Sequence, residues 1–240
     1  MKNITSAGKV YIISTILLAI GLAIWMMAET DWANPWLYLL AAIGAVAQTT
    51  KVEGPNDKTN YNIAWFVYGF TFVVFGPIAA QFVVVFSHLV EWIWHKYPWY
   101  IQSFNIGAHV IPMYLAGRVF ETLSQETQVL DLNNAVGMAV AILVFVLTNH
   151  FMVGVVIKLA RGQSFAESGV FGFFTLFLDF TVLSMGMATA LIWYSNPFAS
   201  VLNILPLYLL YNALRVPALE RQLLEVKEMS VQKGLGSIGD

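Results

Sequence analysis

Long apolar runs separated by short polar segments occupy most of this sequence. A last run begins near Phe198, and the others cover residues 10–28, 36–49, 63–94, 101–120, 132–157 and 169–194. A helix that crosses a bilayer needs about 20 apolar residues, and several runs reach that length. The pattern predicts an all-α integral membrane protein, a polytopic helical bundle with short connections.

The run at 63–94 is too long for one straight crossing, and its only interruption is Gly76-Pro77. Proline lacks an amide donor and restricts the residue before it, so this pair ends a helix. Two arrangements fit: two short crossings, or a re-entrant hairpin that returns to the side from which it entered. The bundle then has about eight segments, or six segments and a hairpin. Broken segments of this kind often line a cavity.

The placement of lysine and arginine predicts the orientation, because cytoplasmic loops are enriched in these residues. With 63–94 counted as two passes or as a hairpin, only Arg118 of the twelve lies outside. Both termini are therefore expected in the cytoplasm. The residues expected inside are Lys2, Lys9, Lys51, Lys58, Lys96, Lys158, Arg161, Arg215, Arg221, Lys227 and Lys233.

Composition agrees with a membrane protein and excludes several functions. The chain is 58% hydrophobic and 11% charged, whereas a soluble domain carries about 25% charged residues. A formal net charge of −2 predicts no nucleic-acid partner. The absence of cysteine excludes disulfides, thiol chemistry and cysteine-based metal sites. The run at 10–28 is long enough to span, so it is expected to be a retained helix, not a signal peptide.

Polar side chains inside the apolar runs are the candidate ligand-binding residues, because such groups are costly in hydrocarbon and face the bundle interior. Spacings of four and seven place pairs of them on one helix face. Three interpretations remain open: hydrogen bonds that hold helices together, a ligand pocket, or a metal or haem site. No ligand-spacing motif supports the third, so no metal or cofactor is predicted. The candidates are Gln81, His88, Asn105, His109, Asn149, His150 and Asp179.

Asp179 is the most informative of these candidates. It stands alone among phenylalanine and leucine residues, so it needs a partner inside the bundle. His109 or His150 is the expected partner. No catalytic arrangement accompanies it, because Ser87 and Ser184 lack a nucleophile-elbow context and no glycine-rich phosphate loop is present. We therefore expect that the protein is not an enzyme.

The last apolar run continues into polar sequence, so its helix is expected to leave the membrane. Val216, Leu219, Leu223 and Val226 follow a 3-4 spacing there, which predicts pairing with a second copy of the chain. An amphipathic helix on the membrane surface is the alternative. Pro217 is expected to kink the exit. The chain thus divides into a membrane domain at 1–214 and a cytoplasmic helix with a flexible tail at 215–240.

Three segments resemble a known family. The segments are PLYLLYNALRVPALERQ at 206–222, TNHFMVGVVIKLARGQSF at 148–165 and FGPIAAQFVVVFSHLVEW at 75–92. They resemble bacterial multi-helix sensor domains that precede diguanylate cyclase (GGDEF) or HD-GYP phosphodiesterase domains. The resemblance implies a bacterial inner-membrane location and an output domain that follows the exit helix. No GGDEF, HD or kinase motif is present in these residues, so a cytoplasmic partner or further sequence would supply the output.

The leading functional hypothesis is a sensory input module. It binds a small or lipidic ligand within the bundle and relays the signal through its last helix, by resemblance in cyclic-di-GMP-type signalling. A small-solute transporter or substrate-binding membrane subunit is the main alternative, because transporters also use broken helices and midplane polar groups. A structural assembly subunit is a third possibility, and it predicts that the polar cluster tolerates substitution.

The predicted orientation can be tested with fusions after Asp240. A cytoplasmic C-terminus makes a fused green fluorescent protein fluoresce and leaves a fused alkaline phosphatase inactive. Active phosphatase at this position, with protein of full length in the membrane, would contradict the orientation.

Overall fold

The structure is a computed structural model, and it describes residues 1, 4–53, 60–124 and 132–236. Lys2, Lys58 and the end of the predicted flexible tail lie outside these residues. The long helices are α1 (Ser6–Glu29), α2 (Pro35–Thr49), α3 (Ala64–His95), α4 (Trp99–Leu123), α5 (Leu132–Arg161), α7 (Phe173–Ser195) and α9 (Ile204–Gly236). The short elements are β1 (Val52–Glu53), β2 (Asn60–Tyr61), α6 (Phe165–Ser168), α8 (Pro197–Ser200) and a 3-10 turn at Val201–Asn203.

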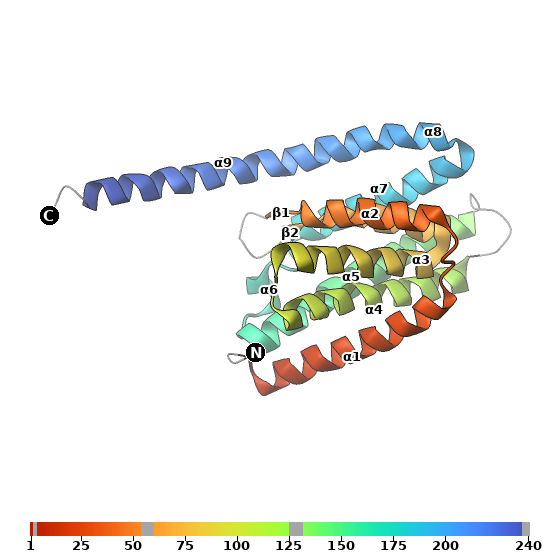
Figure 1. The fold of residues 1–240 in the computed structure, drawn as a ribbon, viewed down its shortest axis with the longest axis horizontal. Coiled ribbons are helices and arrows are strands. Elements are labelled where there is room, and N and C mark those ends of the chain that lie inside the picture. Colours follow the sequence, from red (N-terminus) through yellow and green to blue (C-terminus); the bar gives the residue numbers. More distant parts are fainter. Residues whose placement is uncertain (2–3, 54–59, 125–131, 237–240) are drawn as a thin grey trace.

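The prediction of an all-α bundle is confirmed for the described part of the chain (Figure 1). The exception is the two-residue antiparallel pair of β1 and β2. Some helix ends differ from those predicted from the apolar runs, because capping side chains fix where the helices begin. Thr5 accepts a hydrogen bond from the Gly8 amide, so α1 begins before the predicted residue 10. Asn196 caps α8, so the last long helix begins at Ile204 and not near Phe198.

Helix α3 is a hairpin of two helices. Gly76 has φ 85° and ψ 169°, a conformation that glycine adopts without a side-chain clash. A straight helix of 32 residues would hold its ends about 48 Å apart. Here the ends meet through α2. Asn62, just before α3, donates a hydrogen bond to Gln48, and Gln48 donates to Glu91 near the end of α3 at 2.9 Å.

The turn of this hairpin lies at the opposite end of the bundle. Gly76 and Pro77 line a cavity of about 280 Å³ together with Glu29 and Asn34, which flank the α1–α2 connection, and with Glu121 of α4. Both halves of α3 therefore run the length of the bundle next to α2. The segments around Lys51 and Lys96 therefore lie at the same end of the bundle. The distribution of lysine and arginine along the sequence predicted this.

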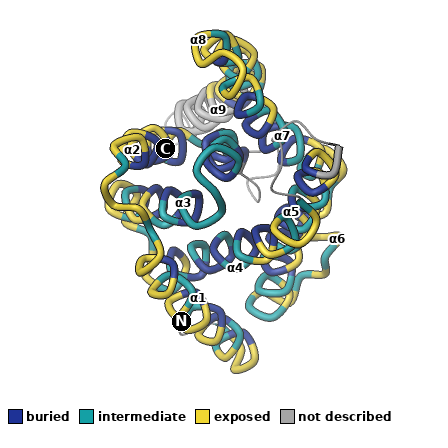
Figure 2. Tube along the Cα trace, turned by 90° about the vertical axis from the view of Figure 1, so that its right-hand side faces the viewer, coloured by how far each residue is buried: buried dark blue, intermediate teal, exposed yellow. Residues whose placement is uncertain are grey.

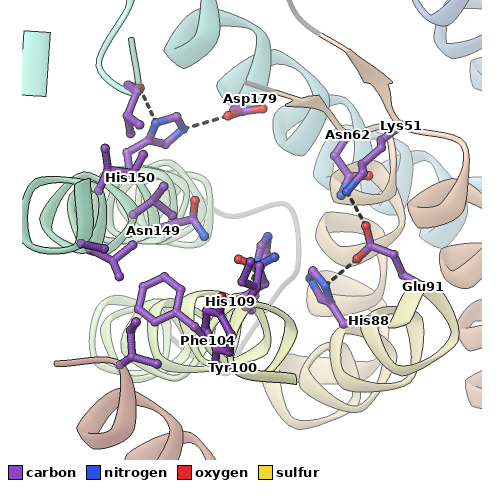
Figure 3. Close-up of a pocket in the computed structure, with 18 of the residues that line it drawn as sticks. Lys51, Asn62, His88, Glu91, Tyr100, Phe104, His109, Asn149, His150 and Asp179 are labelled. Atoms are coloured by element: carbon purple, nitrogen blue, oxygen red, sulfur yellow. Dashed lines mark hydrogen bonds and ion pairs between the residues drawn. The ribbon is translucent and has the colours of Figure 1, made fainter. Parts of the chain in front are cut away.

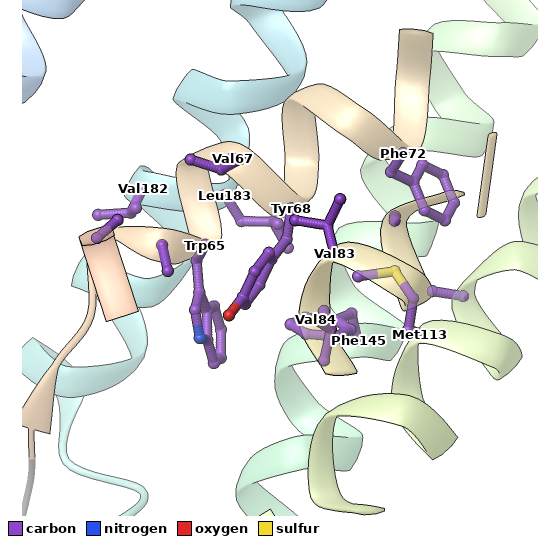
Figure 4. Close-up of a cluster of buried hydrophobic side chains, with 14 of the residues drawn as sticks. Trp65, Val67, Tyr68, Phe72, Val83, Val84, Met113, Phe145, Val182 and Leu183 are labelled. Atoms are coloured by element: carbon purple, nitrogen blue, oxygen red, sulfur yellow. The ribbon is translucent and has the colours of Figure 1, made fainter. Parts of the chain in front are cut away.

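The two halves of α3 also form the centre of the apolar core (Figure 4). Side chains of both halves are buried against α4, α5 and α7. The core residues labelled in the close-up include Trp65, Tyr68, Phe72, Val83, Val84, Met113, Phe145, Val182 and Leu183, which are all less than 6% exposed. Burial of this surface is the main favourable term that holds the hairpin closed.

Helices α3 and α7 approach each other closely at two glycines. A Cβ atom built on Gly186 would lie 2.0 Å from the Phe66 carbonyl oxygen, and one on Gly69 would lie 2.6 Å from the Leu183 carbonyl oxygen. Small residues allow this backbone contact between membrane helices, which strengthens van der Waals packing.

Many exposed positions of the bundle carry apolar side chains, as a membrane protein requires. Figure 2 shows the exposed positions in yellow. Leu17, Ile24 and Val46 are each 64% exposed, and soluble proteins rarely expose such continuous apolar surface. Among the described residues, five helices are long and apolar enough to cross a membrane. These helices are Ser6–Glu29, Ala64–His95, Asn134–Arg161, Phe173–Ser195 and Pro197–Glu220. The fold thus fits a multi-pass membrane protein.

Helix α9 departs from the bundle, and its far end projects beyond the other helices (Figure 1). Its helical structure continues through Pro217 without interruption. Ala218 is buried against the bundle, whereas Val216, Leu219 and Leu223 of the predicted seam are 50%, 44% and 61% exposed. The side chain of Val226 lies outside the described residues.

The close contact of α3 with α7 can be tested with alanine substitutions. Gly186→Ala should destabilise the protein by about 1–3 kcal/mol, because its methyl group overlaps the Phe66 carbonyl and the helices must separate. Unfolding in detergent micelles, followed by circular dichroism, measures the loss. Gly21→Ala is the matched control, since nothing lies within 4 Å of a Cβ there. Equal stability of the two variants would contradict the close packing.

Candidate functional site

A cavity of about 560 Å³ lies among α1, α3, α4, α5 and α7 (Figure 3). Ligand pockets commonly have volumes of about 300–1,000 Å³. Six of the seven predicted residues line it: His88, Asn105, His109, Asn149, His150 and Asp179. Gln81 does not line this cavity. It is buried on the second half of α3, and its Oε1 atom has no partner in the described part of the chain.

His150 and Asp179 form a buried pair on one wall of the cavity, which answers the question of the aspartate's partner. The Nε2 atom of His150 lies 2.8 Å from Oδ2 of Asp179. The Nδ1 atom of His150 lies 2.6 Å from the Val170 carbonyl oxygen and must carry a proton to donate there. A single further proton is shared between Nε2 and Oδ2, so the pair is neutral overall whichever atom holds it.

Asn149 forms a hydrogen bond that holds two helices together, which is one of the three interpretations of the intramembrane polar residues given above. Pro112 has no amide hydrogen, so the Ala108 carbonyl four residues earlier lacks its helical donor. Asn149 of α5 donates a hydrogen bond of 2.6 Å from Nδ2 to that carbonyl. This bond ties α5 to α4 and leaves Oδ1 of Asn149 available to the cavity.

Two histidines meet at Trp65 on the inner side of the cavity, and a third contacts one of them. The Trp65 ring packs edge-on against those of His109 and His150, with centroid distances of 5.8 Å and 6.4 Å. The rings of His88 and His109 are 4.5 Å apart. Residues from α3, α4 and α5 are thereby brought into one cluster, although the chain separates them widely.

The opposite wall carries a second buried charge network, centred on Glu91 (Figure 3). Its Oε1 atom lies 2.6 Å from Nζ of Lys51. Its Oε2 atom lies 3.1 Å from Nδ1 of His88 and accepts hydrogen bonds of 2.9 Å from both Gln48 and Gln102. Glu91 is only 1% exposed, so this network satisfies a carboxylate that would otherwise be very costly to bury.

Five polar residues around this network were not among those predicted from the sequence: Gln48, Lys51, Asn62, Glu91 and Gln102. Gln48, Lys51 and Asn62 stand at the edges of apolar runs, where polar residues are ordinary. The spacing of His88 and Glu91, three residues apart on one helix face, is the signal that could have found Glu91. The two glutamines face Glu91 only because α2 and α4 flank the second half of α3.

Lys51 lies outside the helices, and its pKa is raised above the ordinary value. Burial of the ammonium group lowers this pKa, but the adjacent Glu91 carboxylate and Tyr97 together raise it more. Lys51 therefore stays cationic, and its ring contact with Tyr97, 4.9 Å from Nζ to the centroid, adds to the stabilisation.

The described residues contain no group of three or more histidine, cysteine, aspartate or glutamate side chains arranged to hold a metal ion. No protein-family model, curated protein or solved structure matches this chain. The functional argument therefore rests on the geometry of the cavity and its connection to the rest of the fold.

The pair of His150 and Asp179 predicts a characteristic response to mutation. Asp179→Leu should destabilise the protein by about 3 kcal/mol, because it leaves Nε2 of His150 buried without a partner. The double variant Asp179→Leu/His150→Phe should recover much of this loss, because it also removes the stranded group. Unfolding in detergent micelles measures both changes.

Thr181→Val is the control on the same helix, since the Thr181 hydroxyl bonds only to the Phe177 carbonyl of its own helix. This change should have little effect on stability. Additive losses in the double variant would show that the two side chains do not depend on each other.

Proposed function

We propose that this chain is a membrane sensory input module. It binds a small or lipidic ligand in the cavity of about 560 Å³ and transmits binding to helix α9. The ligand enters between helices, because the described connections are short and form no separate domain. Helix α9 then acts on a cytoplasmic output, which a partner protein, a second copy or further sequence supplies.

One observation supports this proposal above the others: the cavity wall is directly connected to α9. Lys51 lines the cavity, and the next two residues form β1, which contacts α9. Val52 of β1 and Ala218 of α9 are both buried in the same apolar cluster. A ligand that displaces Lys51 or Glu91 would move β1 and therefore shift α9.

The proposed orientation places the cavity at the cytoplasmic end of the bundle. Ile4, Lys51 and Arg161 line it, and the Thr5 hydroxyl donates to the Leu159 carbonyl at 2.5 Å, so the N-terminus and the end of α5 lie together. By the positive-inside rule, an end that carries Lys51, Lys96 and Arg161 faces the cytoplasm. Each half of the α3 hairpin then counts as one crossing.

A transporter is the second candidate, and one observation favours it. The cavity of about 280 Å³ at the α3 turn lies at the opposite end of the bundle from the larger cavity. Cavities at both ends beside a broken helix suit alternating access. A transporter does not need the exposed cytoplasmic part of α9, so deletion of residues 219–233 should spare transport and abolish signalling.

The relay to α9 can be tested without knowledge of the ligand. Val156→Phe places a ring in the cavity and imitates occupancy. Spin labels on cysteines that replace the exposed Trp99 and Leu223 report the position of α9 relative to the bundle. In lipid nanodiscs, Val156→Phe should shift the mean distance between the labels by on the order of 2 Å, as helix shifts in other switches do.

Val136→Phe on the exposed face of the same helix is the matched control and should leave the distance unchanged. Lys51→Met, combined with Val156→Phe, should cancel the shift because it uncouples the cavity wall from β1. If the filled cavity leaves the label distance unchanged, α9 does not respond to the cavity, and the sensory proposal is wrong.

A further inference from the structure

The polar side chains around the cavity use most of their hydrogen-bond donors within the protein. Nδ1 of His109 donates to the Asn105 carbonyl oxygen at 2.8 Å. Nδ1 of His150 and Nδ2 of Asn149 also donate to backbone carbonyls. Each of these bonds fixes which atom carries hydrogen, because a carbonyl oxygen can only accept.

His88 is fixed in the same way by Glu91. Gln102 Nε2 is close to His88 Nδ1 at 3.3 Å, but its two hydrogens have better acceptors in the His88 carbonyl at 2.8 Å and in Glu91 at 2.9 Å. Nδ1 of His88 therefore donates to the Glu91 carboxylate. Its Nε2 atom is left as an acceptor that is buried and has no partner among the described residues.

The surface presented to a ligand is therefore rich in acceptors. His109 lines the cavity and is partly exposed, so its Nε2 is an acceptor for a ligand. Nε2 of the adjacent His88 ring, 4.5 Å away between centroids, is fully buried. Asn149 and Asp179 line the same cavity from α5 and α7, and their Oδ1 atoms accept no hydrogen bond from the described residues. A buried acceptor without a donor costs free energy, so a ligand that brings donors gains affinity here.

The buried charges around His109 are balanced, so a fully charged head group is disfavoured there. Glu91 is balanced by Lys51 at 2.6 Å, and Asp179 shares a proton with His150. A buried ammonium group would find no uncompensated carboxylate beside His109, and a carboxylate would meet acceptors in place of donors. The other cation that lines the cavity, Arg161, is an exposed residue at the end of α5. A hydroxyl group is neutral and both donates and accepts, so it suits His109 and the nearby Asn105 amide.

The remaining wall is apolar and comes from α1, α4 and α5. Ile12, Phe104, Val153, Val156 and Ile157 line it. This wall offers a surface for an apolar chain, whose burial contributes about 0.8 kcal/mol per methylene group.

We propose that the cavity is a binding site for an uncharged amphiphile with a hydroxyl head group. The hydroxyl donates to Nε2 of His109, and the apolar chain lies along Ile12, Phe104 and Val153. This inference rests on the proposed sensory function in one respect, since it names the class of ligand that would be sensed, but the site itself does not require the relay to α9.

The test uses 1-octanol, octanoate and octylammonium, which share one chain and differ in the head group. The chain has no cysteine, so Val153→Cys introduces a single reporter in the cavity. The rate of maleimide labelling in nanodiscs then measures occupancy. We expect 1-octanol to slow labelling, and octanoate and octylammonium at the same membrane concentration to leave the rate close to that without a probe.

His109→Phe in this background removes the Nε2 acceptor and keeps an aromatic ring beside Trp65 and Phe145. The concentration of 1-octanol for half-protection should rise roughly ten-fold, the effect of one lost hydrogen bond. His109→Gln should restore part of the protection, because its amide oxygen is an acceptor at a similar reach. Gln81→Leu, outside the cavity, is the control that leaves protection unchanged.

Two outcomes would overturn the proposal. Equal protection by all three probes would mean that the cavity selects only for the apolar chain. Unchanged protection in His109→Phe, with protein that still folds, would mean that the hydroxyl does not contact the histidine. The sensory function fails separately, because it fails when the spin-label distance to α9 does not respond to a filled cavity.

Discussion

The fold depends on a helix that cannot continue. Proline at position 77 supplies no amide hydrogen, and Gly76 adopts a backbone conformation outside the helical region. Helix α3 therefore turns back, and Asn62 and Glu91 come to the same end of the bundle. The cavity, the Glu91 network and the position of Trp65 against α4 and α5 all follow from this reversal. In a straight helix His88 would lie far from Trp65, and no shared site would exist.

Two buried acid–base pairs face each other across the cavity and keep its interior close to neutral. Glu91 is held by a lysine, a histidine and two glutamines, whereas His150 is the one side-chain partner of Asp179 among the described residues. A carboxylate in an apolar environment needs such compensation, and the networks also fix the tautomers of the surrounding histidines. Glu91 fixes the tautomer of His88, whereas the Asn105 carbonyl fixes that of His109 and leaves its Nε2 as an acceptor.

The proposed sensory role depends on the contact between the cavity wall and α9. Lys51 joins the Glu91 network to β1, and β1 contacts the helix that projects from the bundle. The span Pro197–Glu220, which contains the first half of α9, is packed only loosely, because just 6% of its most apolar stretch is buried. A loosely packed element next to a ligand-sized cavity can change position at low cost, which a bistable switch requires.

The sequence by itself determined the helical class, the membrane character and the break in α3. These properties follow from composition, run length and proline chemistry, all of which are local. It also identified six of the side chains that line the cavity, because intramembrane polar residues are expected to face the interior. Only the tertiary structure decided that Asp179 pairs with His150, that Asn149 satisfies the carbonyl freed by Pro112, and that Gln81 lies elsewhere. Periodicity gives the face of one helix, whereas a pair depends on the rotation and depth of two helices. For the same reason the sequence did not predict the roles of Lys51, Gln48 and Gln102. These residues matter because they bind Glu91, and they lie close to Glu91 only when the α3 hairpin is closed.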